Sequence, residues 1–329
     1  MIKKAAWYEK LDGDKVICRL CPFDCRLTPD KKGICKSRYN RDGELVTDNY
    51  GELVTLAVDP VEKKPLYHFY PGTDILSTGP NSCNFQCKHC QNWTISQQKT
   101  STRFVSPDKL VEAALNYRSV GVAFTYTEPL MWFEYIRDVA PLLREENLKV
   151  VLVTNGFINP EPLEELIPLV DAANVDLKSM NPDFYRRICK GKLAPVLDNI
   201  RRLAESKVHL ELTNLIIPGL NDSEKELEEL VAFVAGLSDM IPVHFSAYYP
   251  SYQMEVERTS PAILFKAREK ARMKLKYVFL GNIAASDGAN SYCPSCGRLL
   301  IERKGYHTVV SGVKEGLCTG CGFKTEIKQ

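Results

Sequence analysis

Three closely spaced cysteines, Cys83, Cys87 and Cys90, constrain this chain more than any other feature, because no fourth cysteine lies near them. A structural zinc site takes four protein ligands, and an ordinary cubane cluster takes four cysteines. Three thiolates therefore favour an iron–sulfur cluster with one iron left open. Residues 74–79 are apolar and β-prone and end at Pro80, which predicts a loop after a strand, where α/β barrels carry their chemistry. The alternative is a zinc knuckle with a distant fourth ligand.

The twelve cysteines fall into three groups and one single residue. We call Cys83, Cys87 and Cys90 the triad. Cys189 stands alone, and a single buried thiol usually acts as a small hydrophobe. The other two groups are an N-terminal set, Cys18, Cys21, Cys25 and Cys35, and a C-terminal set, Cys293, Cys296, Cys318 and Cys321. Grouped cysteines in a cytoplasmic protein indicate metal rather than disulfides.

Composition narrows the cellular setting and the partners. The net charge is +2, which gives no electrostatic reason to expect nucleic acid or an anionic membrane as a partner. No stretch approaches the ~18 apolar residues of a membrane span, and the N-terminus lacks the apolar core of a signal peptide. We therefore expect a cytoplasmic protein, with enough apolar residues (44%) for a large core.

Strand and helix patterns alternate over residues 72–284. Expected strands are 75–78, 122–126, 150–154, 173–177, 209–217, 243–248 and 277–280, and expected helices are 107–118, 129–145, 160–170, 182–206, 222–237 and 261–271. This alternation predicts an α/β fold with a parallel sheet and right-handed crossovers. Polar residues at the strand ends favour a barrel over a doubly wound sheet, and no GxGxxG follows the first strand. The domains are then 1–71, 72–284 and 285–329.

The two terminal modules are expected to bind metal. In the C-terminal set, two CxxC pairs each precede a glycine, the pattern of a zinc ribbon. The N-terminal set is compact enough to need a metal for its own stability. Its spacing fits zinc or an auxiliary iron–sulfur cluster, with zinc as the first expectation. Because this module runs directly into the first barrel strand, we expect it to shape the opening of the active site, with His68 as a candidate contributor.

The triad is the CxxxCxxC signature of radical S-adenosylmethionine (SAM) enzymes, and the chain resembles that superfamily. Residues 125–129, Thr-Tyr-Thr-Glu-Pro, stand where these enzymes usually carry Gly-Gly-Glu-Pro. In the activases of glycyl-radical enzymes, an Asp-x-Lys motif and a late histidine contact SAM. The resemblance therefore implies a SAM site formed by Glu128, Asn155, Asp176, Lys178 and His244. Lys178 would pair with the methionine carboxylate, and Glu128 and nearby carbonyls with its ammonium group.

Each of these residues also has a simpler interpretation. Asp176 and Lys178 could form an ion pair at a strand end, and His244 could be an ordinary core histidine. Asn155 and the following glycine form a common turn dipeptide. His89 stands where the family usually has an aromatic residue beside the adenine.

Longer segments, including residues 59–72 and Ile-Pro-Gly-Leu-Asn-Asp at 217–222, resemble the AmmeMemoRadiSam system radical SAM proteins, which are similar to pyruvate formate-lyase activating enzymes. The resemblance implies a partial (β/α)6 barrel and a [4Fe-4S] cluster. It also implies reductive cleavage of SAM to a 5′-deoxyadenosyl radical, with an electron donor such as flavodoxin or ferredoxin.

The substrate stays open at this point. The radical could abstract a hydrogen atom from a protein or peptide, such as a protein of the same system, or from a small molecule, with either terminal module as a lid. A non-enzymatic zinc-binding module is a third interpretation.

Overall fold

Seven parallel strands form the centre of the computed structural model, which describes residues 1–283 and 288–329. In sheet order they are β15 (Val278–Gly281), β14 (Val243–Ala247), β13 (His209–Ile216), β12 (Ala172–Asp176), β11 (Lys149–Thr154), β10 (Gly121–Phe124) and β8 (Asp74–Pro80). All seven predicted strands are confirmed. Within the described residues the sheet is open, since β15 pairs with β14 and ends it.

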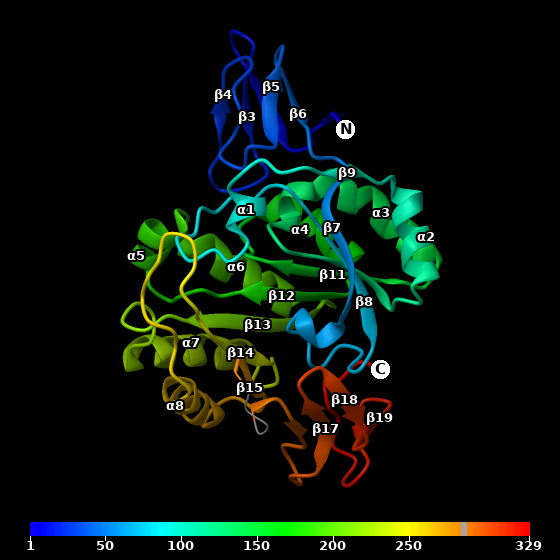
Figure 1. The fold of residues 1–329 in the computed structure, drawn as a ribbon, viewed down its shortest axis with the longest axis vertical. Coiled ribbons are helices and arrows are strands. Elements are labelled where there is room, and N and C mark those ends of the chain that lie inside the picture. Colours follow the sequence, from blue (N-terminus) through cyan, green and yellow to red (C-terminus); the bar gives the residue numbers. More distant parts are fainter. Residues whose placement is uncertain (284–287) are drawn as a thin grey trace.

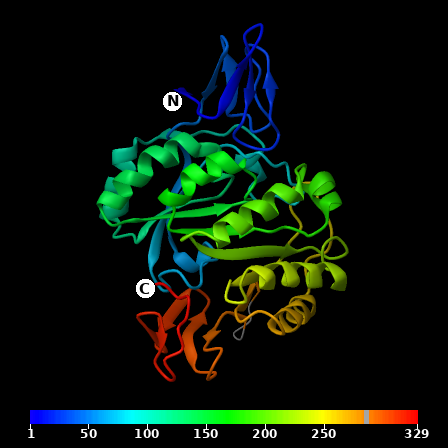
Figure 2. The same ribbon diagram turned by 180° about the vertical axis from the view of Figure 1, so that it is seen from behind.

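Helices fill the six connections between these strands and lie on one side of the sheet (Figures 1 and 2). They are α2 (Pro107–Asn116), α3 (Phe133–Glu145) after the short η2 (Pro129–Trp132), α4 (Pro160–Leu166) with η3 (Ile167–Leu169), α6 (Leu193–Ala204), α7 (Glu224–Leu237) and α8 (Pro261–Arg272). Proline in the first turn, or a serine cap such as Ser223, begins several of them. The α/β fold class is therefore confirmed, with six strand–helix units followed by a seventh, final strand. No helix in the described part of the chain is long and apolar enough to cross a membrane.

The helix expected over 182–206 is split in two, which brings this segment to the triad. A short α5 (Pro182–Phe184) continues as a π-helical turn, η4 (Tyr185–Cys189), and then Lys190 adopts a left-handed φ of 60°. A Cβ atom on Gly191 would lie 2.2 Å from the Phe85 ring, so the contact requires glycine. The break lets the amide of Gln86 donate to the Cys189 carbonyl at 3.0 Å.

The predicted domain boundary at residue 71 lies too late in the chain. Strand β7 (Glu52–Pro60) pairs antiparallel with β8 and belongs to the main sheet, with β9 (Arg103–Phe104) beside it. After η1 (Val61–Lys63), residues of the same segment pack with Ala123 and Val151 of the barrel strands. Apolar burial thus extends the barrel towards the N-terminus. The other expected boundary, at 284/285, lies outside the described residues.

The N-terminal module consists of two small sheets. One has the order β1 (Lys3–Lys4), β6 (Glu44–Thr47) and β5 (Arg38–Arg41), and the other has β2 (Tyr8–Leu11), β3 (Lys15–Cys18) and β4 (Arg26–Leu27). Arg38 joins the module to the barrel, because its guanidinium binds both oxygens of Glu134 on α3, at 2.7 and 2.6 Å. Both side chains are 1% exposed, so losing either one would leave a buried charge unpaired.

The C-terminal module packs against the opposite end of the molecule from the N-terminal module (Figures 1 and 2). Its strands are β16 (Ser291–Tyr292), β17 (Leu299–Lys304), β18 (His307–Val310), β19 (Val313–Lys314) and β20 (Leu317–Cys318). Arg303, which is fully buried, lies 3.5 Å from the Glu62 carboxylate and 4.3 Å from the centre of the Tyr67 ring. His68 contacts the Ser291 hydroxyl at 2.9 Å. His68 thus joins the barrel to the C-terminal module.

Candidate active site at the cysteine triad

The triad follows β8 on a loop that ends at the short helix α1 (Trp93–Ser96). Its sulfurs accept weak hydrogen bonds from the surrounding chain: the Phe85 amide lies 3.4 Å and the Asn155 side-chain nitrogen 3.9 Å from Cys83 Sγ. The Ser96 hydroxyl lies 3.3 Å from Cys90 Sγ. Donors of this kind tune the redox potential of a thiolate-bound cluster.

The triad supplies three thiolates, one fewer than a closed tetrahedral zinc site takes. In a cubane each thiolate binds a different iron. Three cysteines on one loop therefore fit a [4Fe-4S] cluster held by three thiolates.

Glu128 joins the ends of two neighbouring strands beside the triad. Its buried carboxylate accepts hydrogen bonds from the Leu130 amide (3.0 Å), the Thr154 hydroxyl (2.6 Å) and the Asn155 amide (2.8 Å). Burial raises the pKa of Glu128 to about 7, against these donors, which lower it. Much of its bonding capacity is therefore used by the protein itself. The sequence did not indicate Thr154 as its partner.

Tyr126 occupies a backbone conformation that glycine usually takes. Its φ is +75°, in the left-handed region, and its carbonyl accepts from the Asn92 side chain at 2.9 Å. The ring is held in place, because the hydroxyl donates to Asp59 at 3.2 Å and Lys64 lies 5.1 Å from the ring centre. The Thr-Tyr-Thr-Glu segment thus keeps a glycine-like turn without the family's two glycines.

Asn155, Asp176 and Lys178 lie around the triad, as their positions at strand ends predict. The Asn155 side chain donates to Asn84 Oδ1 on the triad loop at 2.8 Å. Lys178 donates to Asp176 at 2.8 Å, and its side chain is 15% exposed. Burial alone would lower the pKa of Lys178, but the charges of Asp176 and of nearby Cys87 raise it well above its ordinary value. A cation is therefore held beside the triad.

Two residues beside the triad extend this picture. Cys189 is a buried thiol close enough to Cys87 for each to shift the pKa of the other, and no spacing in the sequence pointed to it. His89 is 5% exposed, and its Nδ1 has no hydrogen-bond partner. Burial, with a smaller contribution from Lys178, lowers the pKa of His89 to about 3. An unpaired polar atom here fits a bound polar ligand.

His244 does not join this group. It is the second residue of β14, far from the strand's carboxyl end, and its Nε2 lies 2.6 Å from the buried carboxylate of Glu211. The same carboxylate contacts His209 Nε2 at 3.0 Å and accepts the amides of Tyr67 and His68. The expectation of a SAM contact is not supported for His244, because its partners lie in a polar network inside the barrel.

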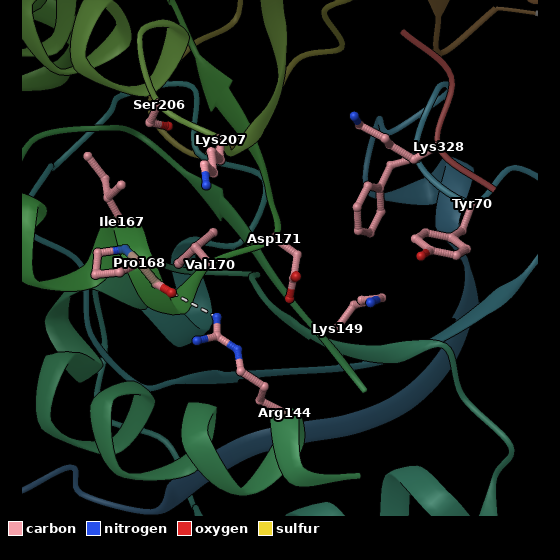
Figure 3. A pocket seen from close by; sticks show the side chains of 11 residues that line it. Tyr70, Arg144, Lys149, Ile167, Pro168, Val170, Asp171, Ser206, Lys207 and Lys328 are labelled. Carbon is pink, nitrogen blue, oxygen red and sulfur yellow. Dashed lines mark hydrogen bonds between the residues drawn. The ribbon is translucent and has the colours of Figure 1, made fainter. Parts of the chain in front are cut away.

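A large pocket, of about 650 Å³, lies at the other end of the strands (Figure 3). It is lined by residues at the starts of β11 and β12, among them Lys149 and Asp171, and by Lys328 near the end of the chain. Neither the triad nor any of the SAM-site candidates lines it. Parallel α/β folds carry their chemistry at the carboxyl ends of the strands, so this pocket is not the active site.

Comparison with known proteins decides the family. The sequence profile "Radical SAM superfamily" matches residues 79–234, which contain the triad, Glu128 and Lys178. An uncharacterized protein of Methanocaldococcus jannaschii, MJ0808, is 41% identical over 99% of both chains. The chain belongs to the radical SAM superfamily. The predicted resemblance is therefore confirmed, and the non-enzymatic interpretation is wrong.

More distant relatives include named activating enzymes. The "putative glycyl-radical enzyme activating enzyme MJ1632" of M. jannaschii is 28% identical over 62% of this chain and 77% of its own length. The pyruvate formate-lyase 1-activating enzyme of Escherichia coli is 23% identical over 51% of this chain and 71% of its own. A radical SAM methyltransferase from Sphaerobacter thermophilus shares the fold, with a TM-score of 0.51 and 18% identity, over 70% of this chain and 71% of its own. The chain is thus a radical SAM enzyme related to the pyruvate formate-lyase activating enzymes.

The conformation of Tyr126 leads to a prediction about stability. We expect the free energy of unfolding of Tyr126→Gly to exceed that of Tyr126→Ala by about 1 kcal/mol. Both variants lose the ring, but only alanine keeps the strain of the left-handed conformation. Urea unfolding of both variants measures the difference. Leu115 in α2 is the control, since an ordinary helical site should favour alanine over glycine. The same order at both sites would contradict the assignment of strain to Tyr126.

Proposed function

We propose that this enzyme abstracts a hydrogen atom from a protein or peptide substrate, as an activating enzyme does. The observation that carries the proposal is the sequence relationship to a named glycyl-radical enzyme activating enzyme, which spans 62% of the chain. When bound, a reduced [4Fe-4S] cluster and SAM would together supply a 5′-deoxyadenosyl radical. The protein's own contribution is to bind and orient these groups and the substrate.

The triad and the residues around it would bind different parts of the cluster and of SAM. Cys83, Cys87 and Cys90 would hold three irons and leave the fourth for SAM. Lys178 is the best-placed partner for the methionine carboxylate, because its ammonium group lies beside Cys87. One of its donors binds Asp176, and the others remain for a ligand.

The remaining contacts follow from the polar groups left near the triad. His89, with its unpaired Nδ1, is suited to a polar group of the cofactor. Glu128 is better described as a positioning residue, since three donors of the protein already bind it.

The shape of the molecule favours a large substrate. The sheet is open at β15, and the C-terminal module packs near Glu62 and His68, away from the triad. That module is therefore poorly placed to be a lid. The N-terminal module does border the triad loop, since Asn49 donates to Ser82, next to Cys83, at 3.1 Å. A pocket of about 490 Å³ lies at this border, lined by Cys35, Asn49 and Ser96 among others. We propose that a protein loop binds there, with a small-molecule substrate as the alternative.

Isotope transfer tests this function directly. The reconstituted enzyme, held without oxygen, would be given SAM, a one-electron donor such as flavodoxin or ferredoxin, and deuterated candidate proteins encoded near its gene. We expect 5′-deoxyadenosine that carries deuterium from one of these proteins. Deuterium from a small molecule, with none from any protein, would contradict a protein substrate. The matched control is the triple variant that combines Cys83→Ala, Cys87→Ala and Cys90→Ala. Formation of 5′-deoxyadenosine by this triple variant would contradict the role of the triad.

Removing the Lys178 charge should weaken SAM binding without loss of iron. Lys178→Ala loses one charged hydrogen bond, on the order of 1.5–3 kcal/mol, so affinity should fall roughly ten- to a hundredfold. Equilibrium binding of SAM to the anaerobic protein measures this. Lys207→Ala, at the pocket on the other end of the strands, is the matched control and should bind SAM normally. Equal affinity for SAM in the two variants would show that Lys178 does not bind SAM and has only a structural role.

We further propose that the C-terminal set holds zinc. Its sulfurs lie 3.6 Å apart for Cys293 and Cys321, and 3.7 Å apart for Cys296 and Cys318. A tetrahedron with Zn–S bonds of 2.3 Å has edges of about 3.8 Å, which supports this assignment.

Cys293→Ser with Cys318→Ser should remove about one zinc per chain and leave the iron content unchanged, because such small modules need their metal to fold. Metal analysis and hydrogen exchange over residues 291–329 would show the loss. An unchanged zinc content would refute the proposal.

A further inference from the structure

We propose that the large pocket at the starts of β11 and β12 binds a phosphate-bearing anion. This ligand is distinct from SAM, because none of the triad cysteines lines the pocket (Figure 3). The proposal is independent of the substrate of the radical reaction. Three features of the pocket support it: its size and lining, its excess of cations, and a wall that the barrel and the C-terminal module share.

The pocket has the size and the mixed lining of a small-molecule site. Its volume of about 650 Å³ lies within the ~300–1,000 Å³ that is typical of ligand pockets. Part of its wall is apolar and includes Phe69, Ile167 and Val170, with the ring of Tyr70 beside them. The rest of the wall carries charged side chains. Such a lining suits a ligand that has an anionic group and a less polar part.

Cations outnumber carboxylates around the pocket. Arg144, Lys149, Lys207 and Lys328 line it, and Asp171 is the only carboxylate among the lining residues that the structure describes. Four cations less one carboxylate give a formal charge of +3, which exceeds the +2 of the whole chain. The excess is therefore local, and it gives the pocket a positive potential that attracts anions.

The lysines of the pocket are not neutralised by ion pairs. Among the described residues, no carboxylate pairs with the ammonium group of Lys149, Lys207 or Lys328. Lysines on the helices behave differently, since Lys109 and Lys270 each pair with a glutamate. The donors of the pocket lysines therefore remain for a ligand, and phosphate oxygens are strong acceptors for them.

Arg144 and Asp171 use only part of their bonding capacity. Arg144 Nη2 donates to the Pro168 carbonyl at 2.7 Å, so its other donors remain for an anion. Asp171 accepts the Val150 amide at 2.8 Å, a bond that joins the start of β12 to β11. This carboxylate thus has a structural partner, and its position at the pocket does not require a bound cation. Figure 3 shows Arg144 and Lys149 on the same side of the pocket as Asp171.

Lys328 brings the C-terminal module into the wall of the pocket. Its amide donates to the His68 carbonyl at 2.8 Å, and its carbonyl accepts the Tyr70 amide at 2.9 Å. These bonds form a short parallel bridge beside Phe69 and fix the backbone of Lys328. An anion bound between Lys328 and the barrel cations would therefore link the two modules.

Calorimetric titration with inorganic pyrophosphate tests the proposal. The full chain with its metals would be titrated at about 0.15 M salt, which screens charges beyond about 8 Å. We expect one saturable site per chain. Lys149→Ala with Lys328→Ala removes two charged donors, so the affinity for pyrophosphate should fall at least roughly tenfold. The matched control is Lys225→Ala with Lys266→Ala on α7 and α8, which makes the same change in net charge outside the pocket and should bind pyrophosphate normally.

A second probe, ADP, identifies the source of the phosphate. Tighter binding of ADP than of pyrophosphate would indicate an organic phosphate that contacts the apolar wall, and equal binding would indicate the phosphate group alone. Either result supports a phosphate site if the pocket variant weakens it. No saturable binding of either probe, or equal affinity in the pocket and control variants, would overturn the proposal.

Hydrogen exchange tests the link between the modules. Bound pyrophosphate should slow exchange at the amides of Tyr70 and Lys328, because these amides join the barrel to the C-terminal module. Binding with unchanged exchange at both amides would contradict a ligand held between Lys328 and the barrel.

Discussion

The hydrogen bonds that brace the triad loop fix the place of its three cysteines, and the rest of the candidate site is arranged around them. The four sulfurs of the C-terminal set, at the other end of the molecule, lie within 4.8 Å of one another, close enough for one tetrahedral ion. The triad loop keeps its spacing because it is braced by neighbouring strand ends. Asn155 bonds to Asn84 on the loop, and the turn before Lys190 bonds to Gln86. The position of the triad cysteines depends on these contacts.

The same region shows how a sequence can keep a site while losing part of its motif. A Cβ on Gly79 would lie 2.1 Å from the Thr125 carbonyl, so the end of β8 must stay glycine for the next strand to approach. Tyr126, the residue after Thr125, has a left-handed φ, and its ring contacts Asp59 and Lys64. Hydrogen bonds from Lys63 and Lys64 lower the pKa of Asp59 although burial alone would raise it. Asp59 therefore stays charged, and its contacts with Tyr126 offset the cost of the strained turn.

Local patterns predicted what depends on local chemistry. Strand β8, strands β10 to β15, the triad at a strand end and the paired CxxC motifs follow from alternation and spacing, which neighbouring residues determine. Contacts between distant segments were not predictable in this way. The break at Lys190 exists because Gly191 meets Phe85, about a hundred residues earlier in the chain. Likewise His244 was read from its order in the chain, but the carboxylate that binds it, Glu211, lies on another strand.

The central claim is that the triad holds a cluster whose fourth iron is open to SAM. Anomalous diffraction at the iron edge, from crystals grown without oxygen and with SAM, tests it most directly. The account predicts iron bonded to Cys83, Cys87 and Cys90, with atoms of SAM as the remaining ligands of the fourth iron. Cys189, a buried thiol that interacts with Cys87, is a competing ligand. A cluster closed by Cys189, or zinc in place of iron at the triad, would contradict the account.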